Sequence, residues 1–150
     1  MADHYVATGA QNIAASLISV LAIYTTTTIR RAKLYEFVIG ADDTPADVAI
    51  RWVLRRQTAV GTNTPVVPIA KDPAAPASTF TSGEDHTGEP TYTAATELFD
   101  QGLNLRATFR WAAGPEQELW MPALASNGLG MAVSHGSNTA VVRCTKSWYE

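Results

Sequence analysis

Short runs of β-branched and aromatic residues, each closed by glycine, proline, asparagine or aspartate, recur along the chain. Such runs fit pleated strands, and the residues between them favour turns. The pattern predicts strands at Ser16–Thr25, Arg31–Gly40, Val48–Thr58, Pro65–Ala70, Thr91–Ala94, Leu103–Ala113, Glu118–Pro122, Gly128–His135 and Thr139–Trp148. The alternating strand–helix rhythm of a parallel α/β fold does not occur in the sequence. We therefore expect an all-β protein, an antiparallel β-sandwich of about eight strands that is jelly-roll-like.

A chain of 150 residues fits one domain with one core. We divide it into an N-terminal arm or first strand, residues 1–29, and a β-sandwich domain, residues 30–150. The N-terminal part is open to two interpretations. Thr8 to Gln11 matches a helix capping box, and the apolar residues of Ile13–Ile23 have helical spacing. The threonines that follow disfavour a helix, so we predict a strand.

Two kinds of connection separate the predicted strands. Asn127-Gly128 and Gly136–Asn138 have the composition of hairpin turns. Lys71–Pro90 is instead rich in proline, alanine and threonine and has little periodicity. We expect it to be a long loop, and loops of this length in compact domains are usually functional or covered by a partner.

The segment Ala49–Thr58, AIRWVLRRQT, carries three arginines in a chain of net charge −3. Alternate residues of a strand share a face, so Ile50, Trp52 and Leu54 are expected to point into the core. The opposite face, with Arg51 and Arg55, is expected to be solvated, to pair with carboxylates or to contact a partner. Arg56 breaks the pattern at the strand end.

The segment Leu103–Ala113 repeats this arrangement. Its inward face is expected to hold Leu103, Leu105, Ala107, Phe109 and Trp111. Arg106 and Arg110 are then expected on the outer face. The two arginine-bearing strands would supply opposite walls of the sandwich.

The remaining chemistry-bearing residues give weak signals. The histidines are isolated, and the loop residues Glu84, Asp85, His86 and Glu89 are more typical of a solvated loop than of a metal site. The sequence has no Gly-x-Ser-x-Gly elbow and no phosphate-binding loop, so we expect no enzyme and no cofactor. The single cysteine, Cys144, is interpreted as a small structural residue.

Charge and hydropathy restrict the partners. A pI near 5.6 argues against a nucleic-acid partner, which usually requires a basic excess. The apolar run Ile13–Ile23 is too short to span a bilayer and lacks a basic start, so no membrane association is expected. Only 17% of residues are charged, which indicates a surface that is weakly polar or covered by a partner.

The order of motifs resembles a family of small structural proteins of tailed-phage virions. The resemblance covers residues 30–150, and its most specific pieces are GEDHTGEPTYTA and LRATFRWAA followed by a Gly-Pro turn. It implies a capsid decoration, or cement, protein on the virion surface, with the major capsid protein as partner and a homotrimer as the assembly by analogy. The candidate assembly interface comprises Arg51, Arg55, Arg56, Arg106, Arg110, Asp85 and His86. The alternatives are a carbohydrate- or receptor-binding module of a fibre and a tail or connector component.

Overall fold

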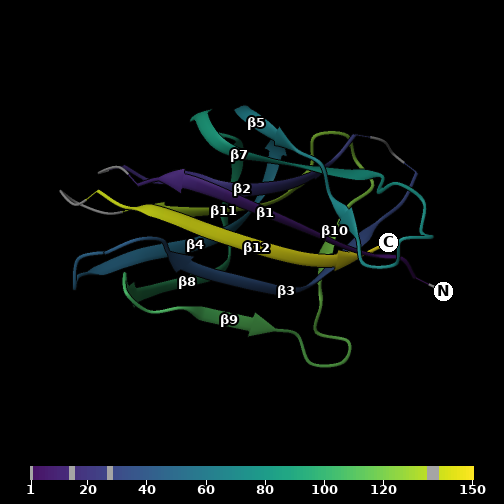
Figure 1. Ribbon diagram of the computed structural model, residues 1–150. Coiled ribbons are helices and arrows are strands. Elements are labelled where there is room, and N and C mark those ends of the chain that lie inside the picture. The colour runs from purple at the N-terminus through teal and green to yellow at the C-terminus, as the bar shows by residue number, and fades with distance from the viewer. Residues whose placement is uncertain (1, 14–15, 27–28, 135–138) are drawn as a thin grey trace.

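The computed structural model describes residues 2–13, 16–26, 29–134 and 139–150. These residues form two antiparallel sheets that pack face to face, which confirms the predicted β-sandwich (Figure 1). The strands are β1 (His4–Asn12), β2 (Ile18–Thr25), β3 (Ala32–Ala41), β4 (Ala49–Ala59), β5 (Thr62–Val66), β6 (Ile69–Ala70), β7 (Phe80–Gly88), β8 (Thr91–Asn104), β9 (Phe109–Ala112), β10 (Leu119–Met121), β11 (Gly128–Ser134) and β12 (Val141–Tyr149). None of the described residues forms a helix long and apolar enough to cross a membrane.

The first sheet has the strand order β10-β3-β12-β1-β6, and β9 also pairs with β3. The second sheet has the order β5-β7-β2-β11-β4-β8. Strands distant in sequence are therefore neighbours, and the two chain ends lie at the same end of the molecule because β1 pairs with β12 from His4–Tyr149 to Asn12–Val141 (Figure 1).

The N-terminal residues contribute one strand to each sheet. β1 lies between β12 and β6 in the first sheet, whereas β2 lies between β7 and β11 in the second. The strand predicted at Ser16–Thr25 is confirmed as β2, whereas β1 was not predicted. The capping-box residues Thr8 and Gln11 lie within β1 rather than at the start of a helix. Pairing on both sides overrides the local helical spacing.

The prediction of one long loop over Lys71–Pro90 is wrong in part. β7 occupies Phe80–Gly88 and pairs with both β2 and β5. Its sequence, FTSGEDHTG, has too few apolar residues to show a strand pattern. Its backbone hydrogen bonds with two neighbours, not side-chain hydropathy, define it as a strand.

The prediction of one strand over Leu103–Ala113 is also wrong. β8 ends at Asn104 in the second sheet, and β9 begins at Phe109 in the first. Asn104 makes the turn, because its carbonyl accepts from Ala107 N at 2.9 Å and its side-chain oxygen accepts from Arg106 N at 2.8 Å. Leu105 is 1% exposed and fills the core where the chain changes sheets.

One turn prediction is wrong. Asn127-Gly128 is not a hairpin turn, because the chain passes there from β10 in one sheet to β11 in the other. Gly128 is required at this point, since a Cβ on it would lie 1.8 Å from the carbonyl oxygen of Ile23. The predicted turn at Gly136–Asn138 lies outside the described residues.

The core confirms the predicted inner face of β4. Ile50, Trp52 and Leu54 are all buried. The opposite face is less exposed than expected, since Val53 is fully buried and Gln57 is 1% exposed. Tyr92, at the start of β8, helps to cover this face, because its ring lies against Gly130 of the neighbouring β11.

Candidate interaction surface

Trp120, on the edge strand β10, is exposed and has two cationic side chains over its ring. The guanidinium carbon of Arg31 lies 4.1 Å from the centre of its ring, and the ammonium of Lys33 lies 4.4 Å from it. The indole is 43% exposed, an unusual state for so large an apolar side chain. Cations over an indole ring are attracted by its quadrupole, so these three side chains hold each other in place.

Main-chain pairing builds this arrangement. Trp120 is the cross-strand partner of Lys33, which brings the two side chains to the same face of the first sheet. The segment after β10 adjoins the end of β2, because Ser126 N donates to Thr25 O at 2.9 Å and Thr25 N donates to Asn127 O at 3.1 Å. Two exposed apolar residues are close in sequence to the cluster: Leu124, 56% exposed, follows Trp120 by four residues, and Ile29, 77% exposed, precedes Arg31 by two.

Arg56 approaches the same place from the second sheet. Its guanidinium donates to the main-chain oxygen of Trp120 at 2.8 Å, which links the end of β4 to the edge of the first sheet. We call the set formed by Ile29, Arg31, Lys33, Arg56, Trp120 and Leu124 the Trp120 patch.

The patch carries excess positive charge. Of its three cations, Lys33 alone has a carboxylate within 4.0 Å among the described residues: Glu118, which lies 3.5 Å from the ammonium and also accepts from the Tyr149 hydroxyl at 3.1 Å. The hydrogen bond that the Lys33 ammonium donates to the Tyr149 oxygen and the charge of Glu118 raise the pKa of Lys33, so the ammonium stays charged. Within the described part of the chain, no carboxylate lies within 4.0 Å of the Arg31 guanidinium.

A second aromatic group lies nearby on the outer face of the first sheet. His4, Tyr35 and Tyr149 pack with ring centres 5.4 to 6.0 Å apart. Lys71 lies over Tyr35, and Lys33 extends from Trp120 to the Tyr149 ring. A hollow of about 290 Å³ adjoins this group and is lined by Ala2, Asp3, His4, Lys71 and Asp72.

The predicted interface residues do not form one surface. Arg51 pairs with Asp100 on β8, and Arg110 pairs with Glu36 on β3 of the other sheet. Arg106 donates to the carbonyl of Pro45 at 3.0 Å. Arg55 lies over the Tyr92 ring, 5.1 Å from its centre. Of the five predicted arginines, Arg56 alone belongs to the Trp120 patch.

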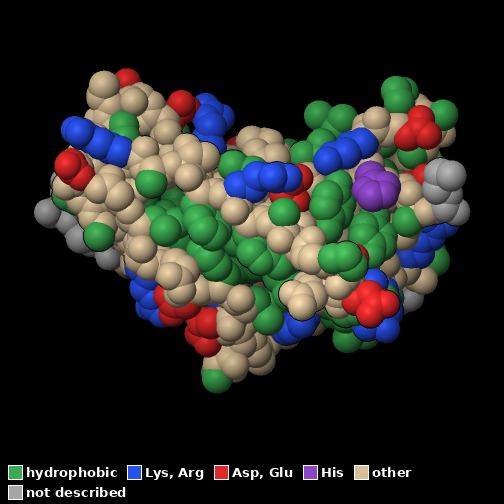
Figure 2. All heavy atoms as spheres, turned by 90° about the horizontal axis from the view of Figure 1, so that it is seen from below, with side chains coloured by type: hydrophobic (Ala, Val, Ile, Leu, Met, Phe, Trp, Pro, Cys, Tyr) green, Lys and Arg blue, Asp and Glu red, His purple; other side chains and the backbone are tan. Residues whose placement is uncertain are grey.

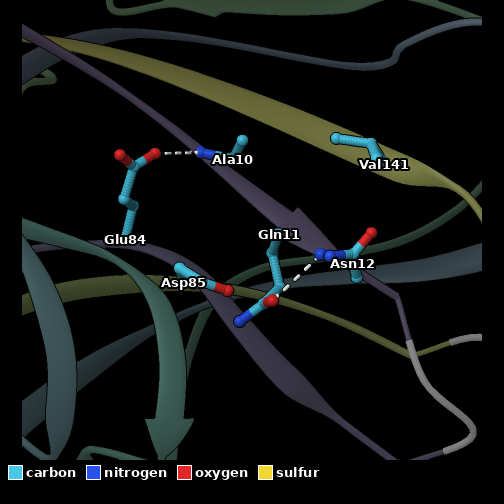
Figure 3. Close-up of a pocket in the computed structure, with 6 residues that line it drawn as sticks. All are labelled: Ala10, Gln11, Asn12, Glu84, Asp85 and Val141. Atoms are coloured by element: carbon cyan, nitrogen blue, oxygen red, sulfur yellow. Dashed lines mark hydrogen bonds between the residues drawn. The ribbon is translucent and has the colours of Figure 1, made fainter.

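Asp85 and His86 lie on β7, far from these arginines in the strand order. Asp85 is exposed and lines a surface pocket of about 250 Å³ with Gln11, Asn12 and Glu84, whose carboxylate accepts from Ala10 N (Figure 3). His86 is only 2% exposed. It lies inside the fold, where its Nδ1 is 3.1 Å from Ser19 O and burial lowers its pKa.

The face that contains β8 and β9 is apolar along its middle. Figure 2 shows hydrophobic side chains gathered there in a band with basic and acidic side chains at its margins. Leu98, Phe99, Phe109 and Trp111 pack there against the core, and Phe99 and Phe109 have ring centres 5.3 Å apart. These residues are partly buried. They fill the edge of the sandwich where β8 of the second sheet meets β9 of the first.

Comparisons with protein-family models, with curated proteins and with solved structures find no match to this chain. Sequence reasoning missed the Trp120 patch because Glu118–Pro122 is too short for its alternation to be informative. Arg30 and Arg31 follow a polar threonine run, and only the pairing of β3 with β10 brings Arg31 to the tryptophan.

Proposed function

We propose that this chain is a non-enzymatic structural protein of tailed-phage virions, a decoration protein that binds the outer surface of the capsid and stabilises it. The major capsid protein is the proposed partner. A homotrimeric state belongs to the same proposal and rests on analogy with decoration proteins. By binding only the assembled shell, such a protein would shift the equilibrium toward that shell.

The Trp120 patch is the observation that carries this proposal. Tryptophan and arginine are enriched among residues that dominate binding energy at protein interfaces. An exposed tryptophan held by two cations, with the exposed Ile29 and Leu124 close to the cluster in sequence, marks an interaction surface more specifically than isolated apolar residues do. The ring is also held before binding by Arg31 and Lys33, which reduces the entropy lost on association.

The test uses capsid shells that lack this protein. Adding the wild-type chain should raise the temperature at which shells rupture, as measured by release of packaged DNA to a dye. Trp120→Ala should abolish most of this gain. Ile69→Ala is the matched control, because Ile69 is 67% exposed on β6 at the opposite edge of the same sheet.

Two results would contradict the proposal. Shells that rupture at the same temperature with and without the wild-type chain would exclude the stabilising role. The number of copies per virion can be measured from stained gels of purified virions. A dozen copies or fewer would favour a tail or connector component instead.

The aromatic group of His4, Tyr35 and Tyr149 favours a second candidate, a carbohydrate- or receptor-binding module. Aromatic rings beside a hollow with carboxylates and a lysine are suited to stacking on a sugar ring and to bonding its hydroxyls. Glycan-array binding by the isolated protein that is lost in Tyr35→Ala but kept in Trp120→Ala would support this function over capsid decoration.

A further inference from the structure

We propose that the Trp120 patch recognises a carboxylate-bearing segment of a protein partner, and that Arg31 holds one of its carboxylates in a bidentate pair. This inference rests on the proposed function for the identity of the partner, and it adds the chemistry by which the partner is recognised.

Arg31 has N–H donors that no described residue accepts. Its guanidinium carbon lies over the indole ring, 4.1 Å from the ring centre, and no hydrogen bond or ion pair joins the guanidinium to a described acceptor. The donors thus remain available in a fork that matches a carboxylate. Trp120 limits the rotation of this fork, so less side-chain entropy is lost when an anion binds.

Three other exposed arginines of this chain pair with carboxylates, whereas the exposed Arg30 and Arg106 have no carboxylate within 4.0 Å among the described residues. Arg51 binds Asp100 through two hydrogen bonds, of 2.9 and 2.5 Å, and Arg143 binds Asp42 at 2.6 Å. Arg110 pairs with Glu36. Arg31 has no such carboxylate among the described residues, although it is exposed and fixed in place. An external carboxylate would complete at Arg31 the pairing that Arg51 already has within the chain.

A protein segment fits the patch better than a nucleic acid does. The chain has a net charge of −3 and so lacks the basic excess that nucleic-acid binding usually requires. Ile29 and Leu124, which are close in sequence to Arg31 and Trp120, are exposed and offer apolar contacts that a phosphate backbone would not use. A short acidic segment that also carries apolar side chains fits both features.

The experiment measures binding of poly-L-glutamate to the full chain, followed by the NMR signals of the arginine Nε–H and tryptophan indole N–H groups. We expect the Arg31 and Trp120 signals to move most. Arg31→Gln should weaken binding about tenfold, the usual value of one charge-assisted hydrogen-bonded contact. Arg31→Lys keeps the charge but lacks the planar guanidinium, so its affinity should lie between those of the wild type and Arg31→Gln. Arg143→Gln is the matched control, since it removes an exposed arginine that is already paired.

The inference is wrong if Arg31→Gln and Arg143→Gln bind poly-L-glutamate equally well. It is also wrong if double-stranded DNA of the same total charge binds more tightly than poly-L-glutamate at the patch. The same variants are then tested on capsid shells. Shell binding that does not depend on Arg31 would overturn the carboxylate recognition and leave the decoration function standing. Poly-L-glutamate binding that depends on Arg31, with no binding to shells, would support the inference and overturn the decoration function.

Discussion

The ammonium group of Lys146, on β12 of the first sheet, donates to the main-chain carbonyl of Leu21, on β2 of the second sheet, at 2.8 Å. The same ammonium group also donates to the main-chain carbonyl of Leu129, on β11, at 2.9 Å. Pairing between β2 and β11 slips by one residue beside Leu21, at a β-bulge. A fully buried lysine thus joins the two sheets next to a local irregularity of the ladder.

Lys146 makes the stability of the fold depend on pH. Burial lowers its pKa from 10.5 to about 8, so between these values the unfolded chain binds more protons than the folded chain. Stability therefore rises with pH across this window, by up to ~3 kcal/mol for one group with such a shift. We expect the free energy of unfolding of the wild type, relative to Lys146→Met, to increase from pH 8 to 10.5. Urea unfolding at a series of pH values measures it, and a difference that does not change with pH would contradict the assignment.

Cys144 should be inert in the folded protein. It is fully buried beside Lys146, and burial raises its pKa to about 11. We expect a disulfide dye reagent at pH 8 to label it only at the rate at which the sandwich opens. The matched control is the double variant Cys144→Ala, Thr145→Cys, which places a thiol on the half-buried outer face. Rapid labelling of the wild type in the absence of denaturant would show that the core is more open than described.

Two tryptophans should differ sharply in their contribution to stability. Trp52 is 2% exposed in the core, so Trp52→Ala should lower the free energy of unfolding by about 3–5 kcal/mol. Trp120 lies on the surface, and Trp120→Ala should change it by less than about 1 kcal/mol. Chemical denaturation of both variants tests this. A large loss in Trp120→Ala would mean that its effect on binding cannot be separated from its effect on folding.

Two glycines offer a test of how closely strands approach in the second sheet. A Cβ on Gly128 would lie 1.8 Å from Ile23 O, and a main-chain oxygen within a sheet has little room to move. We expect Gly128→Ala to destabilise the fold by roughly 2 kcal/mol or more. Gly102→Ala is the control, because a Cβ there meets nothing within 4 Å. Equal melting temperatures for the two variants would contradict the described register of β11.

Period-two alternation was enough to predict the sandwich and the core face of β4. Ile50, Trp52 and Leu54 are buried because a strand alternates its side chains whatever lies beside it. The same rule places Val142, Cys144, Lys146 and Trp148 on one face. It does not reveal that Lys146 is buried with them, because only the carbonyls of Leu21 and Leu129 make that burial tolerable.

The candidate site could not be found this way. The sequence places Trp120 in a short run and Arg31 near the start of a strand nearly ninety positions earlier, and nothing local connects them. The predicted interface arginines were grouped by strand face, yet Arg51 and Arg110 lie in different sheets with separate carboxylates. What the sequence determined by itself was therefore the set of strand faces, since alternation is a property of the local backbone. The tertiary structure alone decided which strands are neighbours, and with it β7, the burial of Lys146 and the Trp120 patch, because these depend on hydrogen bonds and contacts between residues far apart in the chain.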